Sequence, residues 1–184
     1  IGKYALNYCY KLASINVDVN NAQYSSVDGV LFNKAKTELL QYPAGKTNTS
    51  YTIPDSVTSI GNAFYNCESL TSIEIPNTVT SIDEDAFYNC TGLISITIPD
   101  SVTSIGDSAF RSCDSLTSIT IPDSVASIGW GTFYECTSLI SVTIGNNVTS
   151  IGKKAFYNCT SLEKVNWNAK SVANFTYSSD VFYN

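Results

Sequence analysis

Residues 98–106, Ile-Pro-Asp-Ser-Val-Thr-Ser-Ile-Gly, decide the fold because the chain repeats them. The same nine residues stand at 53–61, and near copies stand at 75–83 and 121–129. Five of the 6 cysteines follow these copies at one spacing of 23 residues: Cys67, Cys90, Cys113, Cys136 and Cys159. Self-similarity at a fixed period of this size indicates a solenoid, in which each unit buries its apolar side against its neighbours.

Charged residues are scarce in this 184-residue chain, at 14%, and the polar surface comes mainly from Thr, Ser and Asn. The formal net charge is -6, whereas nucleic acids and anionic membranes attract clustered Lys and Arg. No apolar run approaches the roughly 20 residues of a membrane-spanning helix, and no signal peptide is recognisable. We therefore expect no nucleic-acid partner and no insertion of this segment into a membrane.

One repeat, residues 70–90, shows how each unit folds. Ile73 and Ile75 are separated by the polar Glu74, which is the alternation of a strand with one buried face. Pro76 ends this strand because proline cannot donate to a strand ladder. Strands from successive repeats would form a parallel sheet with a spacing of about 4.8 Å.

The second half of the repeat predicts two further elements. Val79 and Ile82 indicate a second short extended segment. Phe87 and Cys90 lie three residues apart, which predicts a short helical turn that buries both on one side. A further strand is expected around residues 15–17, before the regular repeats begin.

The period is interrupted at residues 20–46. Asp28-Gly29 is typical of a tight turn, and Val30–Asn33 with Thr37–Tyr42 predicts a β-hairpin around residues 33–36. The sequence thus predicts a β-rich α/β solenoid, a right-handed superhelix with a parallel sheet, short helical turns and one inserted β-hairpin.

The whole chain, 1–184, is predicted to be a single domain that forms part of a longer array, because both ends match the middle of a repeat. We divide it into a partial repeat at 1–19, an inserted β-hairpin module at 20–46, regular repeats of 22–23 residues at 51–167 and an irregular or partial repeat at 168–184.

The pattern Ile-x-Ile-Pro-x-Ser-Val-Thr-Ser-Ile-Gly-x-x-Ala-Phe-x-x-Cys-x-Ser-Leu-Thr-Ser resembles the BspA-type leucine-rich repeat, also called the Treponema pallidum type. The hairpin at residues 24–43 resembles a module often interspersed in such arrays. The resemblance covers nearly the whole chain. It implies a secreted or cell-surface protein of a host-associated bacterium or protozoan, of a family described as adhesins or as binders of host proteins such as fibronectin and fibrinogen. It supplies no catalytic motif.

All 6 cysteines, Cys9 included, hold the same repeat position, so we expect their side chains to stack in one column. Side chains in register along a parallel sheet keep a spacing of about 4.8 Å, which is longer than the roughly 3.8 Å between the Cβ atoms of a disulfide. We therefore predict buried free thiols rather than disulfides. The column contains no histidine and lacks the paired short spacings of zinc sites, so we expect no metal site and no cofactor.

A row of aromatic residues is the strongest surface signal. A tyrosine follows the buried phenylalanine in most repeats and should point outward, and an arginine replaces it in the middle coil. We predict this row as the ligand-binding site: Tyr65, Tyr88, Arg111, Tyr134 and Tyr157, with Tyr8 and Tyr183 extending it. Tyrosines are amphipathic and suit protein or glycan partners. The alternative is that the rings only stack on one another and shield the edge of the coil.

Three other surface features leave alternatives open. The outward face of the predicted sheet is mostly Ser and Thr, which favours a solubilising role, although repeat proteins often bind ligands along such a face. The hairpin tip carries Lys34, Lys36 and Glu38, and either recognises a partner or braces the array. Residues 83–85, Asp-Glu-Asp, lack the spacing of a calcium loop, so we interpret them as a solvated turn.

The chain has no histidine and no phosphate-binding glycine loop, so neither Ser-His nor Cys-His catalysis is available. We predict a non-enzymatic binding or adhesion module, extracellular or at the cell surface, whose partners are extracellular or host proteins. Two alternatives stay open: a structural spacer that displays other domains, and a carbohydrate-binding accessory module.

Overall fold

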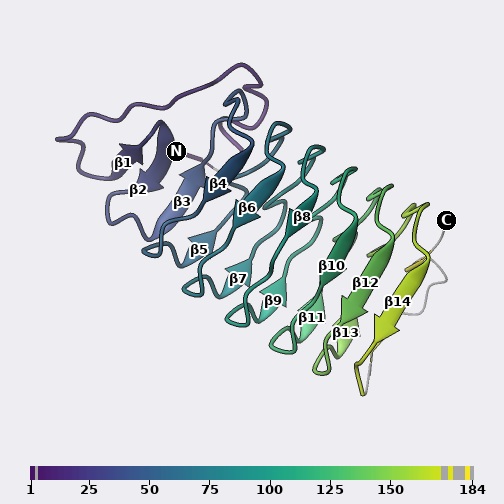
Figure 1. Cartoon of the computed structure of the whole chain (residues 1–184). Coiled ribbons are helices and arrows are strands. Elements are labelled where there is room, and N and C mark those ends of the chain that lie inside the picture. Colours follow the sequence, from purple (N-terminus) through teal and green to yellow (C-terminus); the bar gives the residue numbers. More distant parts are fainter. Residues whose placement is uncertain (3, 171–173, 176–180, 183–184) are drawn as a thin grey trace.

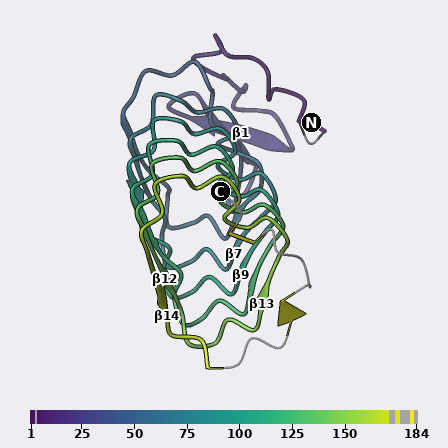
Figure 2. The same ribbon diagram turned by 90° about the vertical axis from the view of Figure 1, so that its right-hand side faces the viewer.

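The computed structural model describes residues 1–2, 4–170, 174–175 and 181–182 (Figure 1). The chain winds into a stack of flattened coils, with the N-terminal strands at one end of the stack and the late strands at the other. Viewed along the stack, successive coils superpose around a common interior between two walls of short strands (Figure 2). This confirms the predicted parallel-sheet solenoid.

The first wall contains the strands predicted from the alternation at Ile73 and Ile75. Its strands pair in parallel and in register, so that Ile73 lies opposite Ile96, its equivalent in the next coil. They form two three-stranded sheets, β4 (Ser50–Thr52), β6 (Ser72–Glu74) and β8 (Ser95–Ile96), then β10 (Ser118–Thr120), β12 (Ser141–Ile144) and β14 (Lys164–Trp167).

The second wall arises from the short extended segment of each repeat and is the longer sheet, with nine strands in the described part of the chain. Each solenoid strand here is a Ser-Ile pair, or Asn-Phe in the last, stacked on its equivalent in the next coil. These strands are β5 (Ser59–Ile60), β7 (Ser81–Ile82), β9 (Ser104–Ile105), β11 (Ser127–Ile128), β13 (Ser150–Ile151) and β15 (Asn174–Phe175).

The core between the walls consists of vertical columns of identical side chains. The phenylalanines stack with ring centroids 5.1–5.3 Å apart and are fully buried up to Phe156, after which Phe182 continues the column. Stacked rings favour such parallel offset contacts. Leucine, isoleucine, valine and cysteine columns surround the phenylalanines.

The predicted helical turn around Phe87 is a run of tight turns instead, and no helix occurs in the described residues. Backbone amides here donate alternately to the next coil and within their own coil. Phe87 N donates to Ala109 O of the next coil at 2.8 Å, whereas Tyr88 N donates to Asp85 O of its own coil at 3.1 Å. Asp85 and Asn89 have φ of 59° and 55°. A helix needs negative φ throughout, so these left-handed residues exclude it and leave alternate amides for the next coil.

The predicted hairpin forms as β2 (Val30–Asn33) and β3 (Glu38–Gln41), and a third antiparallel strand, β1 (Tyr24–Val27), precedes it. Asp28 and Gly29 join β1 to β2 with φ of 50° and 76°, the two positive values of a type I′ turn. β3 then pairs in parallel with β5, so the module extends the second wall at its N-terminal end.

The N-terminal segment packs beside the first coil without forming a strand, and the strand predicted around residues 15–17 is absent. Buried Asn7 anchors the segment, because its side-chain oxygen accepts from Asn62 Nδ2 and its carbonyl from Asn66 Nδ2, both at 3.0 Å. No helix in the described residues has the length and apolar character needed to cross a bilayer.

Candidate functional site

The predicted tyrosine row forms a continuous ladder along the turns that follow the phenylalanine column. The rings of Tyr65 and Tyr88 stack 4.6 Å apart with an interplanar angle of 5°, and those of Tyr134 and Tyr157 stack 4.9 Å apart at 11°. Tyr88, Tyr134 and Tyr157 are half-buried. Their faces therefore contact one another, and the ring edges are what the row presents to solvent.

Arg111 bridges the two tyrosine pairs. Its guanidinium carbon lies 4.4 Å from the centroid of the Tyr134 ring and 5.7 Å from that of Tyr88. Lys154 Nζ lies 4.9 Å from the Tyr157 centroid, so a second cation flanks the row. Cation–π contacts of this kind hold a guanidinium between rings. The structure thus brings all five predicted residues together, while their role in binding a ligand stays a prediction.

The N-terminal end of the row is covered. Tyr65 is only 8% exposed because the Tyr8 ring packs edge-on against it at 5.9 Å and the Tyr4 ring at 6.5 Å. Burial, followed by the hydrogen bond with the Tyr8 hydroxyl, raises the pKa of Tyr65. Tyr8 lies at the end of the row, but it packs edge-on from the N-terminal segment instead of stacking as the other members do. Tyr183 lies outside the described residues. The accessible part of the row therefore runs from Tyr88 to Tyr157.

Trp130 is a neighbour of this row that the sequence analysis missed. Its ring lies 6.2 Å from that of Tyr134 at 22°, and the side chain is 38% exposed. A hydrogen bond of 2.6 Å from Trp130 N to Asp107 Oδ1 fixes its loop. The signal was present in the sequence, because a tryptophan replaces the polar residue that sibling coils carry at this position: Glu84, Asp107 and Lys153.

The residue after each member of the row holds the turn that presents it. Asn66, Asn89 and Asn158 have positive φ, as asparagine tolerates, and Asn89 Nδ2 donates to Asn66 Oδ1 at 3.0 Å. Ser112 and Glu135 hold the equivalent positions after Arg111 and Tyr134, and Glu135 accepts a hydrogen bond from the Ser112 hydroxyl at 3.4 Å. Burial, with Glu135 as a second cause, raises the pKa of Asp114 nearby.

The cysteine column forms with five members, each a buried free thiol. Four of them donate to the phenylalanine carbonyl of the preceding coil at 3.1–3.3 Å: Cys90, Cys113, Cys136 and Cys159. Burial raises the pKa of every thiol in the column, to about 12 for Cys90 and Cys159. Among the described residues no group of His, Cys, Asp and Glu side chains is arranged to hold a metal ion.

The prediction that Cys9 joins this column is wrong, because Cys9 is exposed. In the coil before Cys67 the phenylalanine position belongs to Tyr42, which follows β3 and whose amide donates to Ala63 O as that of Phe64 donates to Ala86 O. The Tyr42 ring stacks on Phe64 at 5.5 Å, and its carbonyl accepts the Cys67 thiol at 3.7 Å. The hairpin module thus supplies the coil that the spacing assigned to the N-terminal segment.

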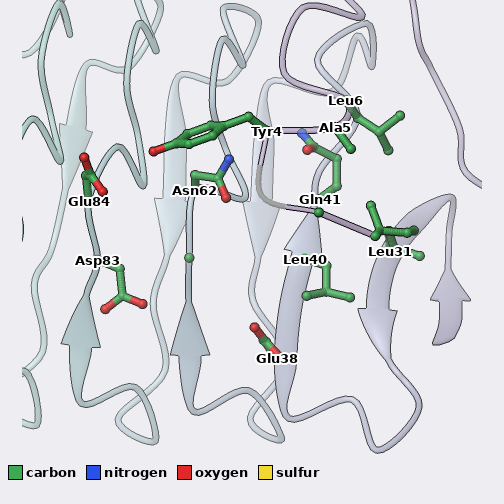
Figure 3. Close-up of a pocket in the computed structure, with 13 residues that line it drawn as sticks. Tyr4, Ala5, Leu6, Leu31, Glu38, Leu40, Gln41, Asn62, Asp83 and Glu84 are labelled. Atoms are coloured by element: carbon green, nitrogen blue, oxygen red, sulfur yellow. The ribbon is translucent and has the colours of Figure 1, made fainter. Parts of the chain in front are cut away.

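Two hollows lie away from the row. A groove of about 680 Å³ crosses the outer face of β4, β6 and β8, where Glu74 accepts from the Thr52 hydroxyl at 3.1 Å. A pocket of about 370 Å³ lies at the N-terminal end, where residues 1–2 and 4–6 face the second wall (Figure 3). Its lining combines the carboxylates of Glu38, Asp83 and Glu84 with apolar side chains.

The other predicted surface features are tied to the fold. Lys34 Nζ at the hairpin turn donates to Val19 O at 3.0 Å. In the acidic turn, Asp83 accepts from the Ser81 hydroxyl at 2.9 Å and Asp85 from the Tyr4 hydroxyl at 3.1 Å. These contacts tie the hairpin turn and the acidic turn to neighbouring segments, and whether the hairpin turn also recognises a partner stays a prediction.

Solved structures similar to this chain include leucine-rich repeat proteins of bacteria. A leucine-rich cell surface protein from Faecalibacterium prausnitzii is 33% identical with a TM-score of 0.87, over 95% of this chain and 48% of that one. A leucine-rich repeat protein from Eubacterium ventriosum is 28% identical with a TM-score of 0.79, over 95% and 51%. The T. pallidum leucine-rich repeat protein is 30% identical with a TM-score of 0.66, over 82% and 70%.

This chain therefore spans about half the length of the first two of these proteins. No curated protein sequence matches it significantly. The profile of the BspA type Leucine rich repeat region matches residues 61–184 in 6 copies, which is more than half of the chain. The chain belongs to the BspA-type leucine-rich repeat family.

Proposed function

We propose that this chain is a non-catalytic binding segment of a cell-surface or secreted protein, and that its tyrosine row contacts extracellular or host proteins. Leucine-rich repeat folds are generally non-catalytic protein-binding modules, and the similar Faecalibacterium prausnitzii protein is a cell surface protein. The observation that carries the proposal is the ladder itself, in which stacked tyrosines and one arginine cross five successive coils without interruption.

The ladder suits protein binding because it is already ordered. Each ring is held by its neighbours, so docking a partner costs little side-chain entropy. Tyrosine and arginine are also the residue types that dominate protein interfaces. Because the contacts repeat along a rigid stack, several weak contacts add up within one interface.

The same stacking favours a protein over a glycan. The faces of Tyr134 and Tyr157 lie against each other, so they do not offer a flat apolar platform to a sugar ring. Ring edges and hydroxyl groups remain, which suit the hydrogen bonds and apolar rim of a protein interface.

The test replaces Tyr88, Tyr134 and Tyr157 by Ser together and measures binding to immobilised fibronectin and fibrinogen, beside a glycan array. The matched control replaces three outward threonines of the first wall by Ser: Thr97, Thr120 and Thr143. We expect the tyrosine variant to lose protein binding and the threonine variant to keep it. Protein binding that survives in the tyrosine variant refutes the row as the site, binding to glycans alone supports a carbohydrate module, and no binding in either assay by the parent supports a spacer.

A further inference from the structure

Arg111 differs from every other basic residue of this chain. It is the single arginine beside nine lysines, and it stands where the sibling coils carry tyrosine. A stacking role alone does not need it, because Tyr134 and Tyr157 stack at the same positions of two adjacent coils. An arginine at this place adds a planar cation with a fork of donors, which neither tyrosine nor lysine provides.

Arg111 forms no ion pair within the described part of the chain. Nε is buried and has no hydrogen-bond partner, and none of the hydrogen bonds of the described residues uses the terminal nitrogens. Two carboxylates lie on neighbouring turns, but Glu135 accepts from Ser112 and Asp114 lies beside Glu135. Since the terminal nitrogens are neither bonded nor buried, they remain open to a ligand.

The surroundings limit the ligand that fits. The rings of Tyr88 and Tyr134 cover the faces of the guanidinium, so a ligand reaches its rim, where two parallel N–H groups match a carboxylate. Lys154, whose Nζ lies 5.9 Å from the Tyr134 centroid, adds a second positive charge next to the same ring. The exposed Trp130 ring offers an apolar surface beside them.

We propose that Arg111 is a carboxylate-binding subsite that takes an aspartate or glutamate side chain of the protein partner. This inference rests on the proposed function, because it assigns the partner's chemistry at the same row. The carboxylate accepts two hydrogen bonds from the rim of the guanidinium, and the backbone that carries it packs against Trp130. The long-range attraction of Lys154 falls with ionic strength, so binding weakens as salt is added.

The experiment follows the Nε–H resonance of the one arginine by NMR in the ¹⁵N-labelled chain. The probes are the blocked tripeptides acetyl-Gly-Glu-Gly-amide and acetyl-Gly-Gln-Gly-amide, which differ only by the carboxylate. We expect the Glu peptide to shift the Arg111 signal and the backbone amide of Tyr134 in a saturable way, and the Gln peptide to leave both in place. Equal shifts with both peptides, or no shift with either, overturn the proposal.

Arg111→Tyr is the matched variant because it restores the residue of the sibling coils and so keeps the stack. We expect it to weaken the Glu peptide about tenfold or more at Tyr134, and Arg111→Lys to recover only part of the loss. An unchanged response in Arg111→Tyr refutes the site. Glucuronic acid is the third probe: saturation at lower concentration than the Glu peptide overturns the assignment to a protein segment. The binding of the tyrosine variant to fibronectin and fibrinogen tests the proposed function, whereas the peptide titration tests the Arg111 subsite. Each proposal can therefore fail without the other.

Discussion

The cysteine column makes the stability of this protein sensitive to alkaline pH. The thiols of Cys90 and Cys159 have their pKa raised by burial from an ordinary 9.0 to about 12. Between these values a thiol is ionised in the unfolded chain but neutral in the native one, so the unfolded state binds fewer protons. The contribution of the neutral buried thiols to the stability of the native state is therefore fully present below pH 9, and it is lost as the pH rises towards 12.

The size of the effect follows from this linkage. A thiol that ionises only in the unfolded state lowers the free energy of unfolding by about 1.4 kcal/mol between about pH 8 and about pH 10. Cys90 and Cys159 together therefore lower it by about 3 kcal/mol over that interval. The pKa of the other three column thiols is also raised by burial, so they add to the loss. A loss of this size is a large fraction of the free energy of unfolding of a typical single domain.

Urea unfolding followed by tryptophan fluorescence at the two pH values measures the loss directly. Cys90→Ala leaves a small cavity that costs the same at both pH values, so it cancels in the difference. We expect this variant to lose about 1.4 kcal/mol less than the parent between the two values. Cys9→Ala is the matched control because its thiol is exposed, and it should keep the full loss. If Cys90→Ala and the parent lose the same free energy, the buried thiol does not carry the pH dependence and the reasoning is wrong.

Three further predictions test the stack. A thiol reagent should react quickly with one thiol per native chain, Cys9, and with all 6 only after denaturation; more than one fast equivalent contradicts the buried column. Phe110→Ala removes a fully buried ring from the stack and should cost about 3–5 kcal/mol in urea unfolding, and an equal cost for the 37% exposed Phe182 would contradict this account. Gly129→Ala should cost about 1–3 kcal/mol because its Cβ would lie 2.5 Å from backbone of the preceding coil, whereas Gly61→Ala meets no atom within 4 Å and should be nearly neutral in thermal unfolding.

The repeat period made most of the fold predictable because each interior position is set by one residue type. Ile73 and Ile75 alternate clearly enough to identify the first wall. The second wall was seen only as a short extended segment, since a two-residue strand such as Ser81–Ile82 is too short to show a period. The helical turn was a wrong expectation because the spacing of Phe87 and Cys90 fits a turn of helix, while the positive φ of Asn89 is invisible to periodicity.

The candidate site was predictable as a row but not in its exposure. That Tyr88 and Tyr134 share a face followed from the period alone. The burial of Tyr65 depends on the packing of Tyr8 from a segment far away in the sequence, which no repeat pattern encodes. The prediction for Cys9 failed for the same kind of reason, since the hairpin module, with Tyr42 at the phenylalanine position, forms the coil that the spacing assigned to the N-terminal segment.

The internal copies also show where specificity is able to arise in such a chain. A buried position touches its own equivalents above and below, so a change at Phe110 disturbs three coils and is held constant. An outward position is open to solvent on one side and tolerates more change, and there the copies diverge: Arg111 replaces tyrosine, and Trp130 replaces a polar residue one coil later. These two departures both lie next to the Tyr134 ring rather than scattered along the stack. A single recognition site in a repeat protein requires neighbouring residues that differ from their equivalents in the other coils, because residues shared by all coils do not distinguish one place on the stack from another.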